Sequence, residues 1–209
     1  MLFRSRRMFN SLRVGKKYFK VLPNATHLCI WEMKAVSDKY LEAVRKPSTM
    51  TTMTMTYSHE ESIKDFAEYV SQTAWNILKS QGYAMDKLAT YFLEMWTQEH
   101  NTFSDMTYHV HGMGAQISAF YFLDTPENGC QMVIHDPRPT KMMVNLPPED
   151  DTKPTDASFN VMFTPQAGTL LLTNAWLPHS FTKNLSLEPC RFVHMNLGVT
   201  VIEPNVEVV

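Results

Sequence analysis

Residues 165–201 read PQAGTLLLTNAWLPHSFTKNLSLEPCRFVHMNLGVTV. This stretch holds three runs of aliphatic, aromatic and β-branched residues, at 169–172, 179–182 and 191–201. Clusters of Pro, Gly, Asn and Glu separate the runs, and such punctuation predicts short strands joined by turns. The C-terminal part of the chain is therefore predicted to be all β.

The same pattern continues upstream as far as residue 90. Five further short runs have this composition: 91–96, 108–110, 116–123, 131–134 and 159–163. Many short strands separated by turn clusters are typical of a sandwich or barrel. We expect residues 90–202 to form a mainly β, jelly-roll-like core.

The N-terminal part differs from this core. Residues 1–31 contain seven Lys or Arg and no acid, which resembles a transit peptide. We favour the simpler interpretation, a basic arm at 1–18 followed by a first strand at 19–22. Apolar residues recur with helical spacing over 58–82, with Ser58 and Glu61 at the spacing of a capping box, which predicts a helix that flanks the core. One or two such helices and the core would make residues 1–209 a single domain.

Composition excludes several classes of protein. A net charge of -2 argues against a general nucleic-acid binder. No run approaches the roughly 18 apolar residues that a membrane span requires. The three cysteines, Cys29, Cys130 and Cys190, show no CxxC spacing. This pattern predicts reduced thiols in a cytoplasmic protein.

Histidines in the predicted core suggest a metal site. His109 and His111 are two residues apart, so on a strand they would project from one face. His179 opens another predicted strand, and Arg191 follows 12 residues later. Imidazoles that meet in a barrel suit a divalent ion such as Fe(II), and an arginine fork suits a carboxylate. Taken alone, each histidine has an ordinary alternative as a satisfied core or surface residue.

The order of these motifs resembles the non-haem Fe(II), 2-oxoglutarate-dependent dioxygenases. Their signature is H-x-D/E, a distal His, and an Arg or Lys ten to fourteen residues beyond it. The resemblance covers about half of the chain, from about Trp96 to Gly198, and rests on the segments 109–111, 117–124, 166–172, 176–179 and 190–196. Together with Asp136-Pro137-Arg138, these segments are most similar to a subgroup found in marine bacteria and their phages. The resemblance implies a double-stranded β-helix, the cupin-like jelly roll.

The resemblance also implies an activity. Fe(II), 2-oxoglutarate and O2 would hydroxylate an organic substrate, with release of succinate and CO2. Arg191 would pair with the far carboxylate of 2-oxoglutarate, and Tyr121 and Asn174 would contact the co-substrate. Each of these residues has an ordinary alternative: Arg191 as a surface ion pair, Tyr121 as core and Asn174 as a turn residue.

The ligand set departs from the family, because His111 stands where the metal carboxylate is expected. An all-histidine set of His109, His111 and His179 is our first interpretation. In the second, Asp136 supplies the carboxylate, although an Asp before Pro also favours a turn. In the third, only His111 and His179 bind the ion, and water or a remote acid completes the shell.

Neither substrate nor assembly follows from the sequence. A peptide, a nucleobase, a lipid or a small molecule would each suit the expected chemistry, and a homodimer is left open. The polar, proline-rich loop at 137–156 is a candidate lid. Two other classes compete with the oxygenase: a cupin-like metal- or ligand-binding module without oxidase activity, and a structural jelly-roll protein of a virion.

Overall fold

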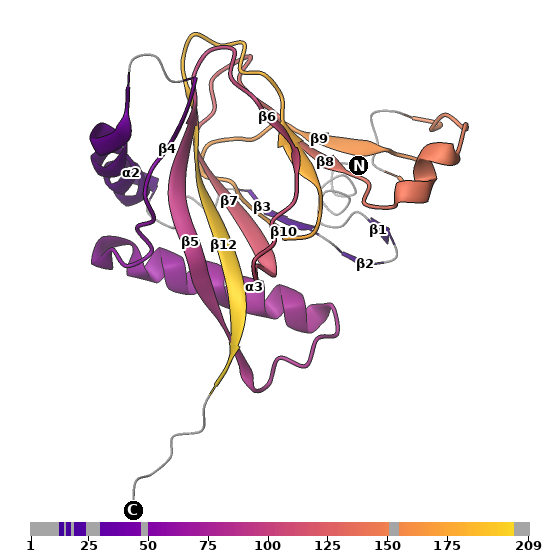
Figure 1. The fold of residues 1–209 in the computed structure, drawn as a ribbon, viewed down its shortest axis with the longest axis horizontal. Coiled ribbons are helices and arrows are strands. Elements are labelled where there is room, and N and C mark those ends of the chain that lie inside the picture. Colours follow the sequence, from indigo (N-terminus) through magenta and orange to yellow (C-terminus); the bar gives the residue numbers. More distant parts are fainter. Residues whose placement is uncertain are drawn as a thin grey trace, which may run out of the picture.

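Two antiparallel sheets face each other at the centre of the computed structural model (Figure 1). The structure describes residues 13–14, 16–17, 19–23, 30–46, 50–150 and 155–202. The larger sheet has six strands, in the order β3 (Phe19–Leu22), β10 (Leu170–Asn174), β7 (Ile117–Asp124), β12 (Cys190–Val201), β5 (Leu88–His100) and β4 (Thr51–Met53). The smaller has four, in the order β6 (Met106–His109), β11 (His179–Phe181), β8 (Met132–His135) and β9 (Asn160–Phe163).

From β5 to β12 the chain passes repeatedly between these sheets. Strands β5, β7, β10 and β12 lie in the larger sheet, and β6, β8, β9 and β11 lie in the smaller one. Residues far apart in sequence are thereby brought into register, for example His109 on β6 beside His179 on β11. Near the N-terminus, β1 (Arg13–Val14) pairs with β2 (Lys16–Lys17). The remainder of the predicted 1–18 arm lies outside the described residues.

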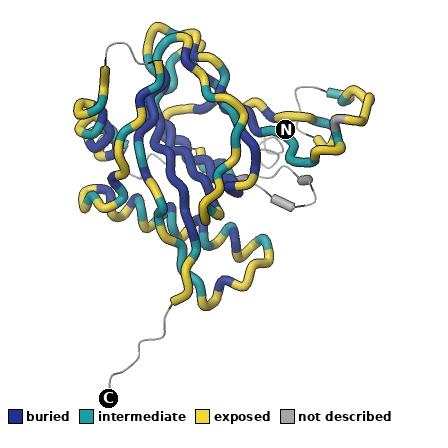
Figure 2. Tube along the Cα trace, viewed as in Figure 1, coloured by how far each residue is buried: buried dark blue, intermediate teal, exposed yellow. Residues whose placement is uncertain are grey.

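Apolar side chains fill the space between the sheets. The larger sheet contributes aromatic residues such as Phe120, Phe122 and Phe192, and the smaller sheet contributes Met132 and Phe181. All five are at most 4% exposed. Figure 2 shows the same arrangement, with buried backbone concentrated in the central strands. The interior is therefore a packed core and not an open channel.

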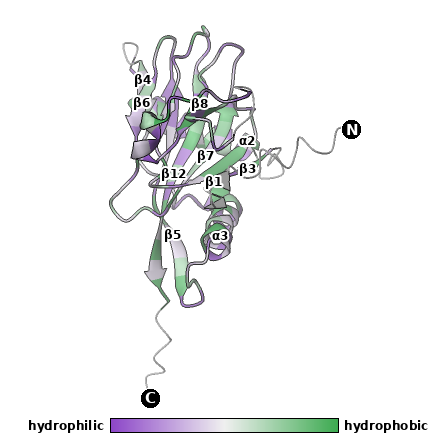
Figure 3. Ribbon diagram, turned by 90° about the vertical axis from the view of Figure 1, so that its right-hand side faces the viewer, coloured by the Kyte–Doolittle hydropathy of each residue, from purple (hydrophilic) through white to green (hydrophobic). Residues whose placement is uncertain are grey.

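Two helices cover the other face of the larger sheet. Helices α2 (Ile30–Val44) and α3 (Lys64–Ser80) lie there, and the side view places α3 and β6 on opposite sides of that sheet (Figure 3). The apolar stripe of α3, which includes Phe66, Val70 and Ala74, packs on odd-numbered residues of β7 and β12.

Most of these elements match the predictions. Each of the eight expected runs between 91 and 201 forms a strand, with boundaries that differ by a few residues. The predicted 58–82 helix is shorter, because a 3-10 turn (η2, Glu61–Ile63) precedes α3. The expected capping box is wrong, since neither η2 nor α3 has a side-chain hydrogen bond at its N-cap. Among the described residues, no helix is both long and apolar enough to cross a membrane.

Candidate metal centre

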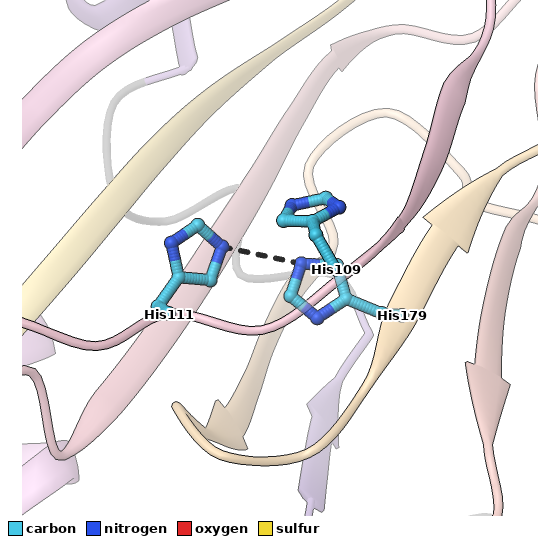
Figure 4. Close-up of side chains that lie close together, drawn as sticks. All are labelled: His109, His111 and His179. Atoms are coloured by element: carbon cyan, nitrogen blue, oxygen red, sulfur yellow. Dashed lines mark hydrogen bonds between the residues drawn. The ribbon is translucent and has the colours of Figure 1, made fainter.

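Three histidines from separate parts of the chain converge at one end of the inter-sheet space (Figure 4). His109 ends β6 and His179 begins β11, and the two are direct cross-strand partners. His111 lies just beyond β6, where its backbone N–H donates to the carbonyl of Ala175 at 2.9 Å. The three ring centroids are 4.4 to 5.1 Å apart. Their potential ligand nitrogens all lie within 4.8 Å of one another.

Backbone carbonyls fix the tautomers of two of these rings. The Nδ1 of His109 lies 2.7 Å from the carbonyl of Thr107, and that of His179 lies 3.1 Å from the carbonyl of Leu177. A carbonyl oxygen only accepts hydrogen bonds, so Nδ1 carries the proton in both rings. The Nε2 atoms of His109 and His179 therefore carry lone pairs that can bind a metal, which is the usual arrangement of a ligating histidine.

His111 completes the cluster through contacts at both nitrogens. Its Nε2 lies 3.3 Å from the Nε2 of His179, and its Nδ1 lies 3.3 Å from the amide of Asn196. Nitrogens bound to one ion at about 2.1 Å, with an angle of about 90–110° between them, are about 3.0–3.4 Å apart. The separation of the two Nε2 atoms fits a shared ion. These hydrogen bonds place the His111 proton on Nε2, since Nδ1 accepts from the Asn196 amide, so binding an ion through Nε2 would require the other tautomer of His111.

His111 and His179 are also in the charge state that a metal requires. Burial, and to a lesser extent neighbouring imidazoles, lower the pKa of His111 to about 4. Burial likewise lowers the pKa of His179 to about 3. Both rings are neutral near pH 7, so binding requires no loss of an imidazolium proton. Imidazole ligands suit Fe(II) and related divalent ions.

The larger sheet forms the opposite wall of this site. One row across its inner face is polar: Glu94, Asn196, Ser118 and Thr173 are consecutive cross-strand partners. Ser118 donates to the amide oxygen of Asn196 at 2.9 Å, and the amide nitrogen donates to Glu94 at 3.2 Å. The next row contains Trp96, His194 and Phe120.

Arg191 does not reach this site. It follows Cys190 on β12, so its side chain lies on the helix-covered face, whereas His194 faces the histidines. Its guanidinium lies 2.8 Å from Asp38 of α2, 3.1 Å from buried Glu99 and 3.4 Å from Asp124. Arg191 is therefore part of an ion-pair cluster on the helix side of the sheet. From this position it does not reach the histidines, so the structure does not support the expected contact with 2-oxoglutarate.

Tyr121 and Asn174 also lie away from the histidines. The Tyr121 ring packs against Phe66 of α3, with 5.0 Å between centroids. Asn174 exchanges two hydrogen bonds, of 2.9 and 3.0 Å, with Gln81 at the end of α3. Both therefore contact the helical layer, and the co-substrate role expected for them does not match their position.

Asp136 is engaged by basic residues. Arg138 donates to both of its oxygens, and Lys141 lies 3.3 Å away. Burial raises the pKa of Asp136, but the hydrogen bonds from Arg138 and Lys141 outweigh it and lower the pKa overall. The cluster of potential metal ligands found among the described residues does not include this carboxylate. The geometry thus favours the all-histidine set over the Asp136 alternative.

Sequence reasoning missed the inner-face residues His194, Asn196 and Trp96. The His194 ring lies 4.6 Å from that of His111 and 4.2 Å from that of Trp96. The available signal was the alternation of side chains along β12. It places Phe192, His194 and Asn196 on one face of the strand and the apolar residues between them on the other.

Comparison with known proteins agrees with this geometry. Residues 94–192 match the family model described as "Putative 2OG-Fe(II) oxygenase". The matched segment contains all three clustered histidines. This match spans just under half of the chain and supports a relationship to the 2OG-Fe(II) oxygenases, which use Fe(II), 2-oxoglutarate and O2. A search of curated proteins finds no significant match.

Solved structures show the same fold. A 2OG-Fe(II) oxygenase family oxidoreductase from Burkholderia pseudomallei is 11% identical, with a TM-score of 0.62, and the match covers 89% of this chain and 86% of that one. The non-heme, alpha ketoglutarate dependent epimerase SnoN from nogalamycin biosynthesis is 14% identical, with a TM-score of 0.66, covering 97% and 86%. A Pseudomonas putida prolyl-4-hydroxylase is 11% identical, with a TM-score of 0.57, covering 87% and 92%. The predicted double-stranded β-helix is confirmed.

Proposed function

We propose that His109, His111 and His179 hold the Fe(II) ion of a 2-oxoglutarate-dependent hydroxylase. The observation that carries this proposal is the convergence of three imidazoles, two of which have their Nδ1 protons held by backbone carbonyls, so that Nε2 carries the lone pair. When bound, the ion with 2-oxoglutarate and O2 would supply the oxidation, giving a hydroxylated substrate, succinate and CO2.

The protein's own contribution is ligation, orientation and exclusion of water. The carbonyls of Thr107 and Leu177 hold two rings in the ligating tautomer, and Asn196 contacts the third. His179 is fully buried, and the aromatic core behind it keeps water out of the inter-sheet space. Approach to the centre is therefore from the side of His109 and His111, which are partly exposed.

A metal content and turnover experiment tests the proposal. Purified protein is reconstituted anaerobically with Fe(II), and succinate formation from 2-oxoglutarate is measured after O2 is admitted. We expect His179→Ala to lose both bound iron and succinate formation. His135→Ala is the matched control, because His135 lies on the same small sheet but bonds Ser180. Ser180 follows His179 on β11, so its side chain points to the opposite face of the strand. Equal iron retention by wild type and His179→Ala would contradict the proposal.

A second candidate is the metal-binding module without oxidase activity. It is favoured by the aromatic filling of the space between the sheets, which includes the stacked rings of Phe181 and Phe192 at 4.7 Å. This candidate predicts stable metal binding with no effect of 2-oxoglutarate on the iron's absorption spectrum. Succinate formation above the His179→Ala background would exclude it.

The proposal includes a reducing, cytoplasmic location and an organic substrate of small-molecule or peptide size. Cys130 and Cys190 support the location, since both are buried and free although the Cys130 backbone N–H donates to the Cys190 sulfur at 2.9 Å. For the substrate, the 137–156 segment stays a candidate lid. Its 3-10 turn η3 (Pro139–Met143) borders a pocket of about 400 Å³ that Arg138 and Lys141 help to line.

A further inference from the structure

Buried polar atoms without hydrogen-bond partners lie on the inner face of the larger sheet. They include Trp96 Nε1, His194 Nε2 and Thr173 Oγ1, each with almost no solvent-accessible area. Buried polar groups in folded proteins nearly always have a partner. Several unpartnered groups on the wall that faces a metal site therefore indicate a place for a ligand.

Two of the side chains that carry these atoms lie together beside the histidine cluster. Trp96 on β5 and His194 on β12 are cross-strand partners, with ring centroids 4.2 Å apart. The His194 ring is 97% buried (3% exposed) and lies 4.6 Å from the His111 ring. Thr173 lies on β10, two strands from β12, and so about 10 Å away at the usual strand spacing.

Among the described residues of this face, no arginine or lysine accompanies them. Between Cys190 and Asn196 the inward-facing residues of β12 are Cys190, Phe192, His194 and Asn196, and Arg191 points to the helices. On β5 the corresponding residues between Glu94 and His100 carry no cation. A negatively charged group of a ligand would therefore accept hydrogen bonds here from uncharged donors.

We propose that Trp96 and His194 form an anion subsite that binds the far carboxylate of a 2-oxo dicarboxylic acid, in place of an arginine. This inference rests on the proposed function, because the other end of the same acid would lie at the metal. Two N–H donors in a buried site can hold a carboxylate, which accepts hydrogen bonds more strongly than a neutral carbonyl. The Trp96 indole is donor-only, and His194 Nε2 can donate in the matching tautomer.

Calorimetric titration of the Ni(II)-loaded protein tests this subsite without turnover. The probes are 2-oxoglutarate and 2-oxovalerate, which has the same carbon chain but no second carboxylate. We expect wild type to prefer 2-oxoglutarate, and Trp96→Phe and His194→Phe each to weaken its binding about tenfold. Binding of 2-oxovalerate should stay within about twofold, which also reports that each variant is folded and metal-loaded.

Arg191→Gln and Thr173→Val are the matched controls, and neither should change the ratio of the two affinities. The proposal is overturned if both Trp96→Phe and His194→Phe keep the preference for 2-oxoglutarate over 2-oxovalerate, or if either control loses that preference. If wild type binds both acids equally, the proposed function stands and the subsite does not exist. If Ni(II)-loaded wild type binds neither acid, the proposed function fails together with the subsite.

Discussion

The two faces of strand β12 differ in nearly every physical respect, although their residues alternate along one backbone. Toward the helices the strand presents Arg191, Val193 and Met195, which make ion pairs with or pack against α2, α3 and β5. Toward the smaller sheet it presents His194, whose Nε2 is unpartnered, and Asn196, which bonds Ser118 and Glu94 and contacts His111. On the first face the Arg191 guanidinium makes three ion pairs although its Nε has no partner, whereas on the second face His194 Nε2 and the neighbouring Trp96 Nε1 have none.

This difference separates stability from function within one element. A side chain whose contacts are complete contributes to the free energy of folding and has no capacity left for a ligand. A buried side chain with an unsatisfied donor costs stability unless a ligand satisfies it. Substitutions on the two faces should therefore change different measurable quantities.

The largest expected effect is on the helix-facing side, at Met195. It is fully buried among residues of α3 and the sheet, so Met195→Ala should lower the free energy of unfolding by about 2–5 kcal/mol. Urea denaturation measures this loss, and Ni(II) affinity of the folded protein should stay within about twofold. Val201→Ala on the same strand is the control, because Val201 is 64% exposed. Loss of metal binding in Met195→Ala would contradict the separation of stability and function between the two faces.

Arg191 tests the same face electrostatically. Arg191→Gln leaves buried Glu99 with Arg45 as its remaining cationic partner among the described residues. We expect a loss of about 2–3 kcal/mol in unfolding free energy, since a buried carboxylate loses a charged hydrogen bond. Lys34→Gln is the control, because Lys34 pairs with Asp124 while both side chains are about a third exposed. Equal losses of unfolding free energy in the two variants would show that the burial of Glu99 does not strengthen its ion pair with Arg191.

On the inner face, Asn196→Ala should act on metal affinity. Outer contacts of ligating histidines typically contribute 10–100-fold to metal affinity, so we expect Ni(II) binding to weaken by about 10-fold or more. Competition with a chelating dye measures this. Ser118→Ala removes the bond to Asn196 but leaves the Asn196–His111 contact, and should have a smaller effect. An unchanged affinity in Asn196→Ala would mean that His111 is oriented by its backbone alone.

The comparison of faces also explains what the sequence could and could not predict. Composition and turn clusters sufficed for the strands, and H-x-H with a distal histidine sufficed for His109, His111 and His179. Arg191 was assigned by its distance from His179, and distance along the chain ignores which side of a strand a residue occupies. A shift of one residue moves a side chain to the opposite face. His194, three residues further on, occupies the face on which a ligand-binding residue was expected.

The last expected effect appears only as the pH is lowered, and it concerns a histidine deeper in the core. His100 is fully buried between Phe181 and Phe192, and burial lowers its pKa to about 4, whereas an unfolded histidine titrates near 6.5. Between these values the unfolded chain binds the extra proton, so stability falls as the pH is lowered from about 6.5 toward 4, by up to about 1.4 kcal/mol per unit. His100→Phe removes this group while keeping an aromatic ring against Phe192. Urea denaturation of both proteins at several pH values should show that the unfolding free energy of the variant falls less steeply as the pH is lowered. The loss of the hydrogen bond to Gln98 lowers stability equally at every pH and leaves this slope unchanged. Parallel curves would mean that His100 becomes protonated without unfolding, and that this part of the inner face is as open to water as the metal end.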